Sequence, residues 1–464
     1  MSTIQENFLS YSQMEFLMEN KIKGEKQRTT RANIAYSSLH ATYWMYYGVI
    51  YSFSSVFLLS KGYSNFEIGI IIAVGNILAV LLQPIVADFA DRSKNLDLFD
   101  IMKIITAITL VSAVIISFLR GKSILLSVSF TLALSLNTMM QPFCNSVNFK
   151  LHTVNLNTNF GFDRSFGSLG YSVLCFILGF LVAKMGIRVL PVSGIIILIA
   201  LFFVISLQKK QYEEAKEIKG NKEEKDDKES ELLNTEEIQG NGVYLAEADE
   251  ETIEGIGPEN QAQSSINDIT LTQFFCRNKV FMVMSLGTLG VYIANAIMNS
   301  YMAQITSYAG GDTKDLGTLF SVLALLEIPT LMLFNKIQKR FRCTTLLIFA
   351  AWAFVLRMAV VHLATNIVVL FISQLVQPFS FALFLPAMVH FIDENMSEAE
   401  AIKGQAIFTT MTTVAGVITG IGGGLILDHL GVPALTIMGT FATLIGALVI
   451  SFSVKRIQTE AKYE

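Results

Sequence analysis

Twelve stretches of the chain, each long enough to cross a lipid bilayer, carry few or no charged residues. An α-helix rises about 1.5 Å per residue, so about 20 apolar residues span the ~30 Å hydrocarbon core. Short charged turns, such as residues 336–342, separate the stretches. We therefore expect an all-α membrane protein with twelve transmembrane helices. The stretches begin near Ser38, Phe66, Phe99, Ser123, Ser165, Arg188, Lys279, Leu316, Cys343, Asn366, Ile402 and Val432.

The amino-acid composition agrees with this class and excludes others. Only 16% of the 464 residues are charged, against roughly 25% in soluble domains, which argues against an ordinary soluble enzyme. No phosphate-binding loop, nucleophile elbow or zinc-protease motif occurs in a suitable context. The four cysteines and five histidines show neither disulfide nor metal-ligand spacing. We expect a protein that is not an enzyme and has no cofactor, no metal and no nucleic-acid partner.

An acidic segment divides the stretches into two sets of six. Between Lys209 and Asp268 there are 7 lysines and 18 acidic residues, with few aromatic residues. Such a composition cannot bury enough apolar surface to fold, so we expect residues 209–270 to be a disordered cytoplasmic loop, with docking of a regulator as the alternative. The other expected segments are a cytoplasmic tail at 1–36, six-helix bundles at 37–208 and 271–456, and a cytoplasmic tail at 457–464.

Basic residues in the short loops set the expected orientation, because they resist translocation across the membrane. With both termini in the cytoplasm, the cytoplasmic side holds basic clusters such as residues 21–31 and 336–342, while the outer side has fewer basic residues, such as Lys61 and Arg120. Residues 1–36 are polar and carry no secretory signal. We expect a multi-pass monomer in the bilayer of the cell membrane.

The two sets of six stretches resemble each other in outline. A basic cluster follows the second stretch of each set, and glycines recur along the fifth, at Gly161, Gly167 and Gly170 in the first set and from Gly404 onward in the second. Parallel six-helix repeats around a central cavity are one architecture of secondary transporters. We expect two six-helix pseudo-repeats that enclose such a cavity.

The turn after the second stretch reads Ala-Asp-Phe-Ala-Asp-Arg-Ser-Lys at residues 87–94. It resembles the signature of the major facilitator superfamily, in which an acid and the basic residues after it hold one conformation of the bundle through a helix N-terminus and arginines. The resemblance implies that Asp91 and Arg92 form a conformational gate. Ala87 stands where the signature has glycine, and a plain charged turn is the alternative.

A glycine-rich motif opens the fifth stretch, Gly-Phe-Asp-Arg-Ser-Phe-Gly-Ser-Leu-Gly-Tyr at residues 161–171. It is similar to a signature of the lactose permease and nucleoside symporter group within that superfamily. The resemblance implies that Arg164 binds substrate hydroxyls and that Tyr171 stacks on a sugar ring. A guanidinium offers a planar fork of donors, and an aromatic face matches a pyranose or nucleoside. The alternative places Arg164 at the helix end, where it reaches lipid phosphates.

Two charged residues, Glu327 and Arg357, lie near the middle of otherwise apolar stretches. An isolated charge there costs about 3 kcal/mol, so both side chains should face the bundle interior. The lactose permease has an acid and an arginine at similar places, which implies proton coupling through Glu327 and Arg357. An acid that alternately approaches and leaves a guanidinium can release and take up a proton. A static buried salt bridge is the alternative.

The chain departs from the permease pattern where the permease has its proton-coupling histidine and acid. Residues 374–379 read Gln-Leu-Val-Gln-Pro-Phe, with neither group. The permease's substrate-binding acid is replaced by Asn145 or Ser146, depending on the alignment. Neutral hydrogen-bonding side chains remain, which favours a polar neutral solute. The expected substrate-binding residues are Arg164, Tyr171, Asn145, Asn295, Asn299 and Tyr47.

These features together predict a secondary active transporter. We expect it to move a small polar solute, namely a sugar, an oligosaccharide or a nucleoside-like compound, by alternating access coupled to protons. Two alternatives stay open: a facilitator or exporter of amphipathic compounds, and a membrane receptor or scaffold that does not transport.

Overall fold

The computed structural model describes residues 2–93, 96–158, 160–240 and 271–463, and within these ranges every regular element is helical, as expected. Before the gap at 241–270 the elements are α1 (Ser2–Tyr47), the π-helical turn η1 (Gly48–Ser52), α2 (Ser54–Ser60), α3 (Asn65–Arg92), α4 (Leu98–Phe118), α5 (Ile124–His152), α6 (Phe160–Met185) and α7 (Val189–Gly240). After it they are α8 (Leu271–Arg277), α9 (Lys279–Ser300), α10 (Met302–Tyr308), α11 (Thr313–Gln338), α12 (Cys343–His362), α13 (Ile367–Gln374), the 3₁₀ turn η2 (Gln377–Phe379), α14 (Phe381–Asn395), α15 (Glu398–Ile418), the π-helical turn η3 (Thr419–Gly423) and α16 (Gly424–Tyr463).

Ten helical segments of the described chain are long and apolar enough to cross a membrane. One of them, Glu400–Arg456, holds two crossings, because Gly431 (φ 76°, ψ −173°) interrupts it in a backbone conformation that is almost restricted to glycine. One further crossing is made of α1, η1 and α2 in series. The described residues therefore contain the twelve expected crossings, six on each side of the gap.

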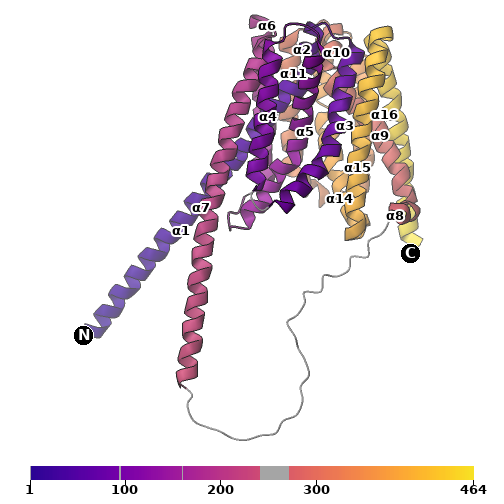
Figure 1. The fold of residues 1–464 in the computed structure, drawn as a ribbon. Coiled ribbons are helices and arrows are strands. Elements are labelled where there is room, and N and C mark those ends of the chain that lie inside the picture. Colours follow the sequence, from indigo (N-terminus) through magenta and orange to yellow (C-terminus); the bar gives the residue numbers. More distant parts are fainter. Residues whose placement is uncertain (1, 94–95, 159, 241–270, 464) are drawn as a thin grey trace.

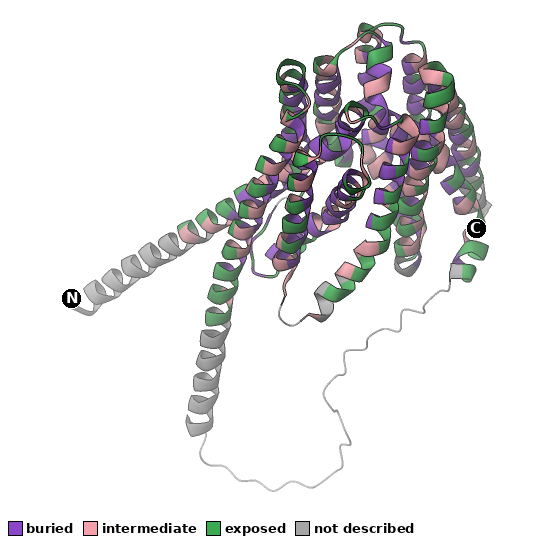
Figure 2. Cartoon of the chain, turned by 45° about the horizontal axis from the view of Figure 1, so that its top comes forward, coloured by how far each residue is buried: buried purple, intermediate pink, exposed green. Residues whose placement is uncertain are grey.

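Both ends of the chain lie at the same end of the helical bundle, as an even number of crossings requires (Figure 1). We call this the terminal end, and the opposite end, where α2 and α10 lie, the distal end. Buried residues concentrate where the helices face one another (Figure 2). Large apolar side chains such as Phe203, Leu356 and Phe441 are exposed on the outside, where a bilayer would cover them.

The structure differs from the expectation of a disordered segment that starts at residue 209. Helix α7 continues without a break to Gly240 and projects beyond the bundle at the terminal end (Figure 1). Lys209 pairs with Asp100 of α4 at 2.6 Å, and Lys210 pairs with Glu214 one turn later at 3.9 Å. Oppositely charged residues four positions apart stabilise a helix, which explains why this charged composition extends α7. The rest of the expected loop, 241–270, lies outside the described residues.

The expected N-terminal tail also differs in form, because α1 begins at Ser2 and runs through it into the first crossing. Residues near the end of this tail already pack into the bundle, since Ala32 and Tyr36 are fully buried. The first crossing therefore joins the bundle before residue 37.

The first, tenth and eleventh crossings are interrupted within the bundle. The π-helical turns η1 and η3 each replace one turn of α-helix, and the tenth crossing breaks between α13 and α14. At this break Pro378 lacks a backbone N–H, and Ser380 adopts a non-helical conformation (φ −95°, ψ −97°). Interrupted transmembrane helices are common around transporter binding sites, because the break turns polar groups toward a cavity.

Candidate functional site

A cavity of about 380 Å³ lies between the two halves of the bundle. Both halves contribute side chains to it, and many of these side chains are polar or aromatic. The lining residues are Trp44, Tyr47, Tyr51, Asn76, Val80, Thr138, Gln141, Arg164, Ser168 and Tyr171 from the first half, and Tyr292, Asn295, Ala296, Asn299, Leu323, Ala324, Glu327, Leu331, Gln377, Phe381, Leu385, Thr412, Thr413 and Gly416 from the second.

One wall of the cavity is a row of aromatic rings from α1 and η1. Trp44, Tyr47 and Tyr51 follow one another at spacings of three and four residues, which places them on one helix face. The ring centres of Trp44 and Tyr47 are 5.0 Å apart, and those of Tyr47 and Tyr51 are also 5.0 Å apart with nearly parallel planes. The Trp44 and Tyr47 planes are tilted by 53°, so the row forms an uneven aromatic wall that a ring-shaped solute can contact.

Arg164 of α6 lies against the start of this row. Its guanidinium carbon is 4.2 Å from the centre of the Trp44 ring, a cation–π contact. Gly167, one turn later, allows the helices to come this close, because a Cβ at this position would lie 2.5 Å from Cδ1 of Trp44. Arg164 and Gly167 of the 161–171 motif therefore both pack against Trp44 at the cavity wall.

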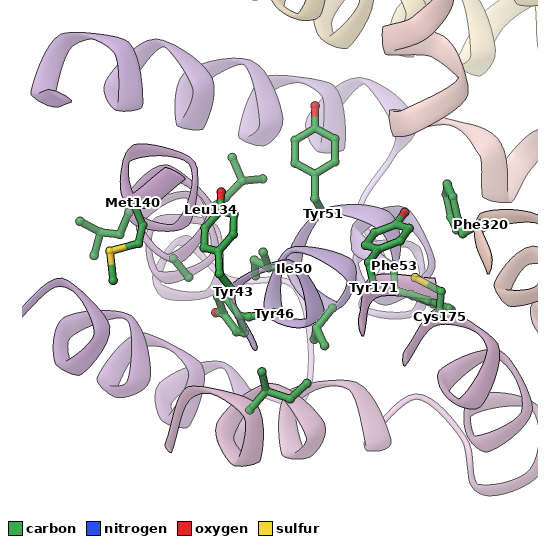
Figure 3. Close-up of a cluster of buried hydrophobic side chains, with 14 of the residues drawn as sticks. Tyr43, Tyr46, Ile50, Tyr51, Phe53, Leu134, Met140, Tyr171, Cys175 and Phe320 are labelled. Atoms are coloured by element: carbon green, nitrogen blue, oxygen red, sulfur yellow. The ribbon is translucent and has the colours of Figure 1, made fainter. Parts of the chain in front are cut away.

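Tyr171 continues the aromatic wall from α6. Its hydroxyl lies 2.7 Å from the hydroxyl of Ser52, which fixes the orientation of the ring. The ring centre is 6.4 Å from that of Tyr47 and 6.5 Å from that of Phe320 in α11. Figure 3 shows Phe320 beside Tyr171, with the hydroxyls of Tyr171 and Tyr51 pointing to the same side.

Glu327 and Arg357 are linked through an amide instead of forming a direct ion pair. Arg357 is 1% exposed and donates hydrogen bonds to the side-chain oxygens of Gln374, at 2.8 Å, and of Gln377. The side-chain nitrogen of Gln377 in turn donates to the carboxylate of Glu327, which lines the cavity. The break in the tenth crossing allows Gln377 to lie between the two charges.

The role of Gln377 was not foreseen in the sequence, although the signal was present. Two amides precede a proline in an apolar stretch, and the neighbouring crossings carry one acid and one arginine. Polar side chains in the middle of a membrane helix need internal partners. On that basis the two amides, the acid and the arginine are candidates for one hydrogen-bonded network.

The remaining predicted site residues divide into three groups. Asn295 and Asn299 line the cavity from α9, together with the residues described above. Asn145 does not line the cavity. The residues of α5 that line it are Thr138 and Gln141, and Asn145 lies one turn further along that helix. The side chains of Asp91 and Arg92 lie outside the described part of the structure.

The two halves meet closely at the distal end of the cavity. Asp428 of α16 accepts hydrogen bonds from the backbone N–H groups of Asn65 and Phe66, at 3.0 and 2.9 Å, and from the Asn65 amide at 2.8 Å. It therefore caps the N-terminus of α3, a helix of the other half. Gln304 of α10 also reaches the first half, by donating to the side-chain oxygen of Asn65 at 2.8 Å. These contacts close the distal end.

Asp428→Ala is expected to favour the conformation that is open at the distal end. A lost helix cap costs ~1 kcal/mol, and a change of this size shifts a two-state equilibrium about 5-fold. The measurement is the labelling rate of a cysteine introduced at the cavity residue Ala296, with the exposed Cys276 changed to serine and a bulky thiol reagent added from each side.

Asp312→Ala is the matched control. Asp312 caps α11, a helix of its own half, by accepting from the N–H of Lys314 at 2.7 Å and of Asp315 at 3.2 Å. Its loss should lower stability without changing access to the cavity. Equal labelling rates in both variants would show that the Asp428 contact does not hold the two halves together.

Comparison with known proteins assigns the chain to a family. The MFS_1 like family matches residues 36–435, a range that includes every residue lining the cavity. The chain belongs to this family. It is therefore a membrane transporter of the major facilitator type, as the motifs at 87–94 and 161–171 predicted.

Individual relatives of this MFS_1 like protein agree with the assignment. The uncharacterized transporter YwbF of Bacillus subtilis (strain 168) is 20% identical over 403 residues, which cover 84% of this chain and 86% of YwbF. A mutant of the nucleoside transporter NupG has a similar fold, with a TM-score of 0.66 and 14% identity over 92% of this chain and 99% of NupG. The POT family transporter PepTSo is similar with a TM-score of 0.63 and 9% identity, over 94% of this chain and 99% of PepTSo. At these identities the solved structures establish the fold alone.

Proposed function

We propose that this protein is a secondary transporter that moves a small, ring-containing polar solute, such as a nucleoside or a sugar, by alternating access coupled to protons. The observation that carries the proposal is the cavity between the halves, which combines the aromatic row with a guanidinium, several amides and one acid. The fold shared with NupG, described as a nucleoside transporter, supports the same class of solute.

The lining suits a ring with polar substituents. The aromatic row of Trp44, Tyr47 and Tyr51 offers apolar ring contacts, and Asn295, Asn299 and Gln141 offer both donors and acceptors to hydroxyl or carbonyl groups. Binding pockets of 300–1,000 Å³ commonly hold such compounds. The cavity therefore fits one ring compound better than a long chain.

Coupling to protons is proposed to depend on Glu327. It is the one carboxylate among the described residues that line the cavity. Its contact with Gln377, and through Gln377 with the buried Arg357, ties its charge to the packing of the tenth crossing. Binding or loss of a proton at Glu327 would change that contact and so bias the two conformations of the bundle.

The test is a thermal-shift screen of the purified protein against nucleosides, monosaccharides, disaccharides and short peptides. A ligand of the native state raises the apparent stability, and its flux is then measured in proteoliposomes with and without a pH gradient. A nucleoside or sugar that stabilises the protein and crosses the membrane supports the proposal. Flux of amphipathic compounds alone, or no flux of any compound, would overturn it.

Glu327→Gln is expected to uncouple transport from protons. The amide keeps the size and hydrogen bonding of the side chain but cannot exchange a proton, so a pH gradient should no longer drive accumulation while exchange of solute across the membrane persists. Glu394→Gln is the control, since Glu394 is exposed and accepts a hydrogen bond from Gln338 outside the cavity. Unchanged gradient-driven accumulation in Glu327→Gln would remove this residue as the proton carrier.

A further inference from the structure

A second cavity, of about 410 Å³, lies between α6 of the first half and α11 of the second. On its distal side these two helices pack tightly. A Cβ on Gly317 would lie 2.7 Å from Cα of Gly179, and the hydroxyls of Ser172 and Ser321 are 2.8 Å apart. Toward the terminal end the space between the helices widens into the cavity, which is lined by side chains within residues 160–168 and 328–335. We call it the lateral opening.

The outer side of the lateral opening faces the surroundings of the bundle. On α6, Phe162 shares a face with Leu169 and Phe176, which follow at intervals of two turns, and all three are exposed. On α11, Met332 shares a face with Leu325 in the same way, and both are exposed. These are the outward faces that a bilayer would cover. Phe162 and Met332 both line the lateral opening, so its mouth lies against lipid.

The inner side of the lateral opening meets the central cavity. Arg164, Ser168 and Leu331 line both cavities. The lateral opening therefore runs between the two halves, from the membrane-facing surface to the wall of the candidate site.

The height and lining of the lateral opening match one leaflet of a bilayer. From Phe160 to Ser168 an α-helix rises ~12 Å, close to half of the ~30 Å hydrocarbon core. Ile328 and Met332 make the opposite wall largely apolar. At the terminal end Asn335 lines the opening, and the next residue, Lys336, is exposed and positively charged. An apolar slot that ends beside an ammonium group suits an acyl chain with a phosphate at its end.

We propose that the lateral opening is a phospholipid site: a lipid of the leaflet at the terminal end places one acyl chain between α6 and α11, with its phosphate near Lys336. The site goes beyond the proposed function, which does not depend on it. Alternating access closes the terminal end when the distal end opens, and the approach of α6 and α11 then expels the chain. A bound lipid therefore favours the conformation that is closed at the distal end.

A tryptophan behind the inner side of the lateral opening can report the acyl chain. The guanidinium carbon of Arg164 lies 4.2 Å from the centre of the Trp44 ring. The chain has one other tryptophan, Trp352, which is exposed on α12. Trp352→Phe leaves Trp44 as the one source of tryptophan emission, and Trp44→Phe leaves Trp352 as a positive control on the lipid-facing surface.

The experiment compares the emission of each single-tryptophan protein in vesicles of dioleoylphosphatidylcholine and of the same lipid with bromine added across the chain double bonds, because bromine quenches tryptophan at short range. Trp352 should lose emission in the brominated vesicles, and Trp44 should lose emission as well. Ser165→Phe and Ile328→Phe, which fill the opening from either helix, should restore the emission of Trp44. Leu169→Phe, which adds the same ring to α6 outside the opening, should leave it quenched.

Two sets of results would overturn the lipid site. The first is equal Trp44 emission in both kinds of vesicle while Trp352 is quenched, since no chain then reaches the inner side of the opening. This comparison needs no substitution in the opening. The second is quenching of Trp44 that persists in both filled variants, or that is lost in Leu169→Phe as well, since the chain then reaches Trp44 by another route or the response is not specific to the opening. Each of these results leaves the proposed function to the thermal-shift and flux measurements.

Discussion

Gly69→Leu is expected to hold the bundle open at the distal end, which the structure shows closed. A Cβ at Gly69 would lie 1.7 Å from the carbonyl oxygen of Gly420 and 2.7 Å from the hydroxyl of Tyr301. Overpacking usually costs ~1–3 kcal/mol, and this overlap involves backbone atoms that cannot rotate away. A cost of about 3 kcal/mol shifts a two-state equilibrium about 150-fold. The labelling assay at Ala296→Cys measures the shift, with faster reaction expected from the distal side.

Gly422→Leu is the matched control for this variant. Gly422 lies two residues from Gly420 in the same π-helical turn, but a Cβ added to it meets no atom within 4 Å. It should leave the labelling pattern unchanged. Slow distal labelling in Gly69→Leu, in a protein that still folds, would mean that the close contact between α3 and η3 does not need to separate for the cavity to open.

Arg357→Met is expected to lower the free energy of unfolding by ~3 kcal/mol or more, because removing one member of a buried charged network leaves the others without compensation. The side-chain oxygens of Gln374 and Gln377 would lose their donor, and the Glu327 carboxylate would lose its compensating charge. Thermal or denaturant unfolding of the purified protein measures the change.

A double variant separates charge from packing. Arg357→Met combined with Glu327→Gln removes both charges, so part of the lost stability should return, which a double-mutant cycle detects. Arg340→Met, at an exposed arginine, serves as the control and should change stability little. An equal loss of stability in the Arg357→Met single variant and in the double variant would show that the charges of Glu327 and Arg357 are not coupled through Gln377.

Much of the candidate site could be anticipated because intramembrane polar residues are rare. The structure places five of the predicted substrate-binding residues on the wall of one cavity: Arg164, Tyr171, Tyr47, Asn295 and Asn299. Asn145 was also selected, yet it lies one turn beyond the wall. A polar residue in a membrane helix is expected to face away from lipid. Whether it lies at the height of the cavity depends on how the neighbouring helices pack against its helix.

The connection between the halves was misjudged for a related reason. The acidic composition after Lys209 predicts no packed structure, yet Tyr212 and Ala215 are buried in the core, because the segment continues a helix that is already packed. Contacts of Lys209 with Asp100 and pairs such as Lys210 with Glu214 extend α7 instead.

The sequence by itself determined the twelve crossings, the all-α class and the set of side chains that must avoid lipid. These depend on the length of apolar runs and on the cost of a polar group in hydrocarbon, which are local properties of the chain. Only the tertiary structure decided that Gln377 stands between Glu327 and Arg357, that Arg164 stacks on Trp44, and that the distal end is the closed one. Such contacts join residues far apart in the sequence, and the register between packed helices, which no single helix specifies, determines which of them meet.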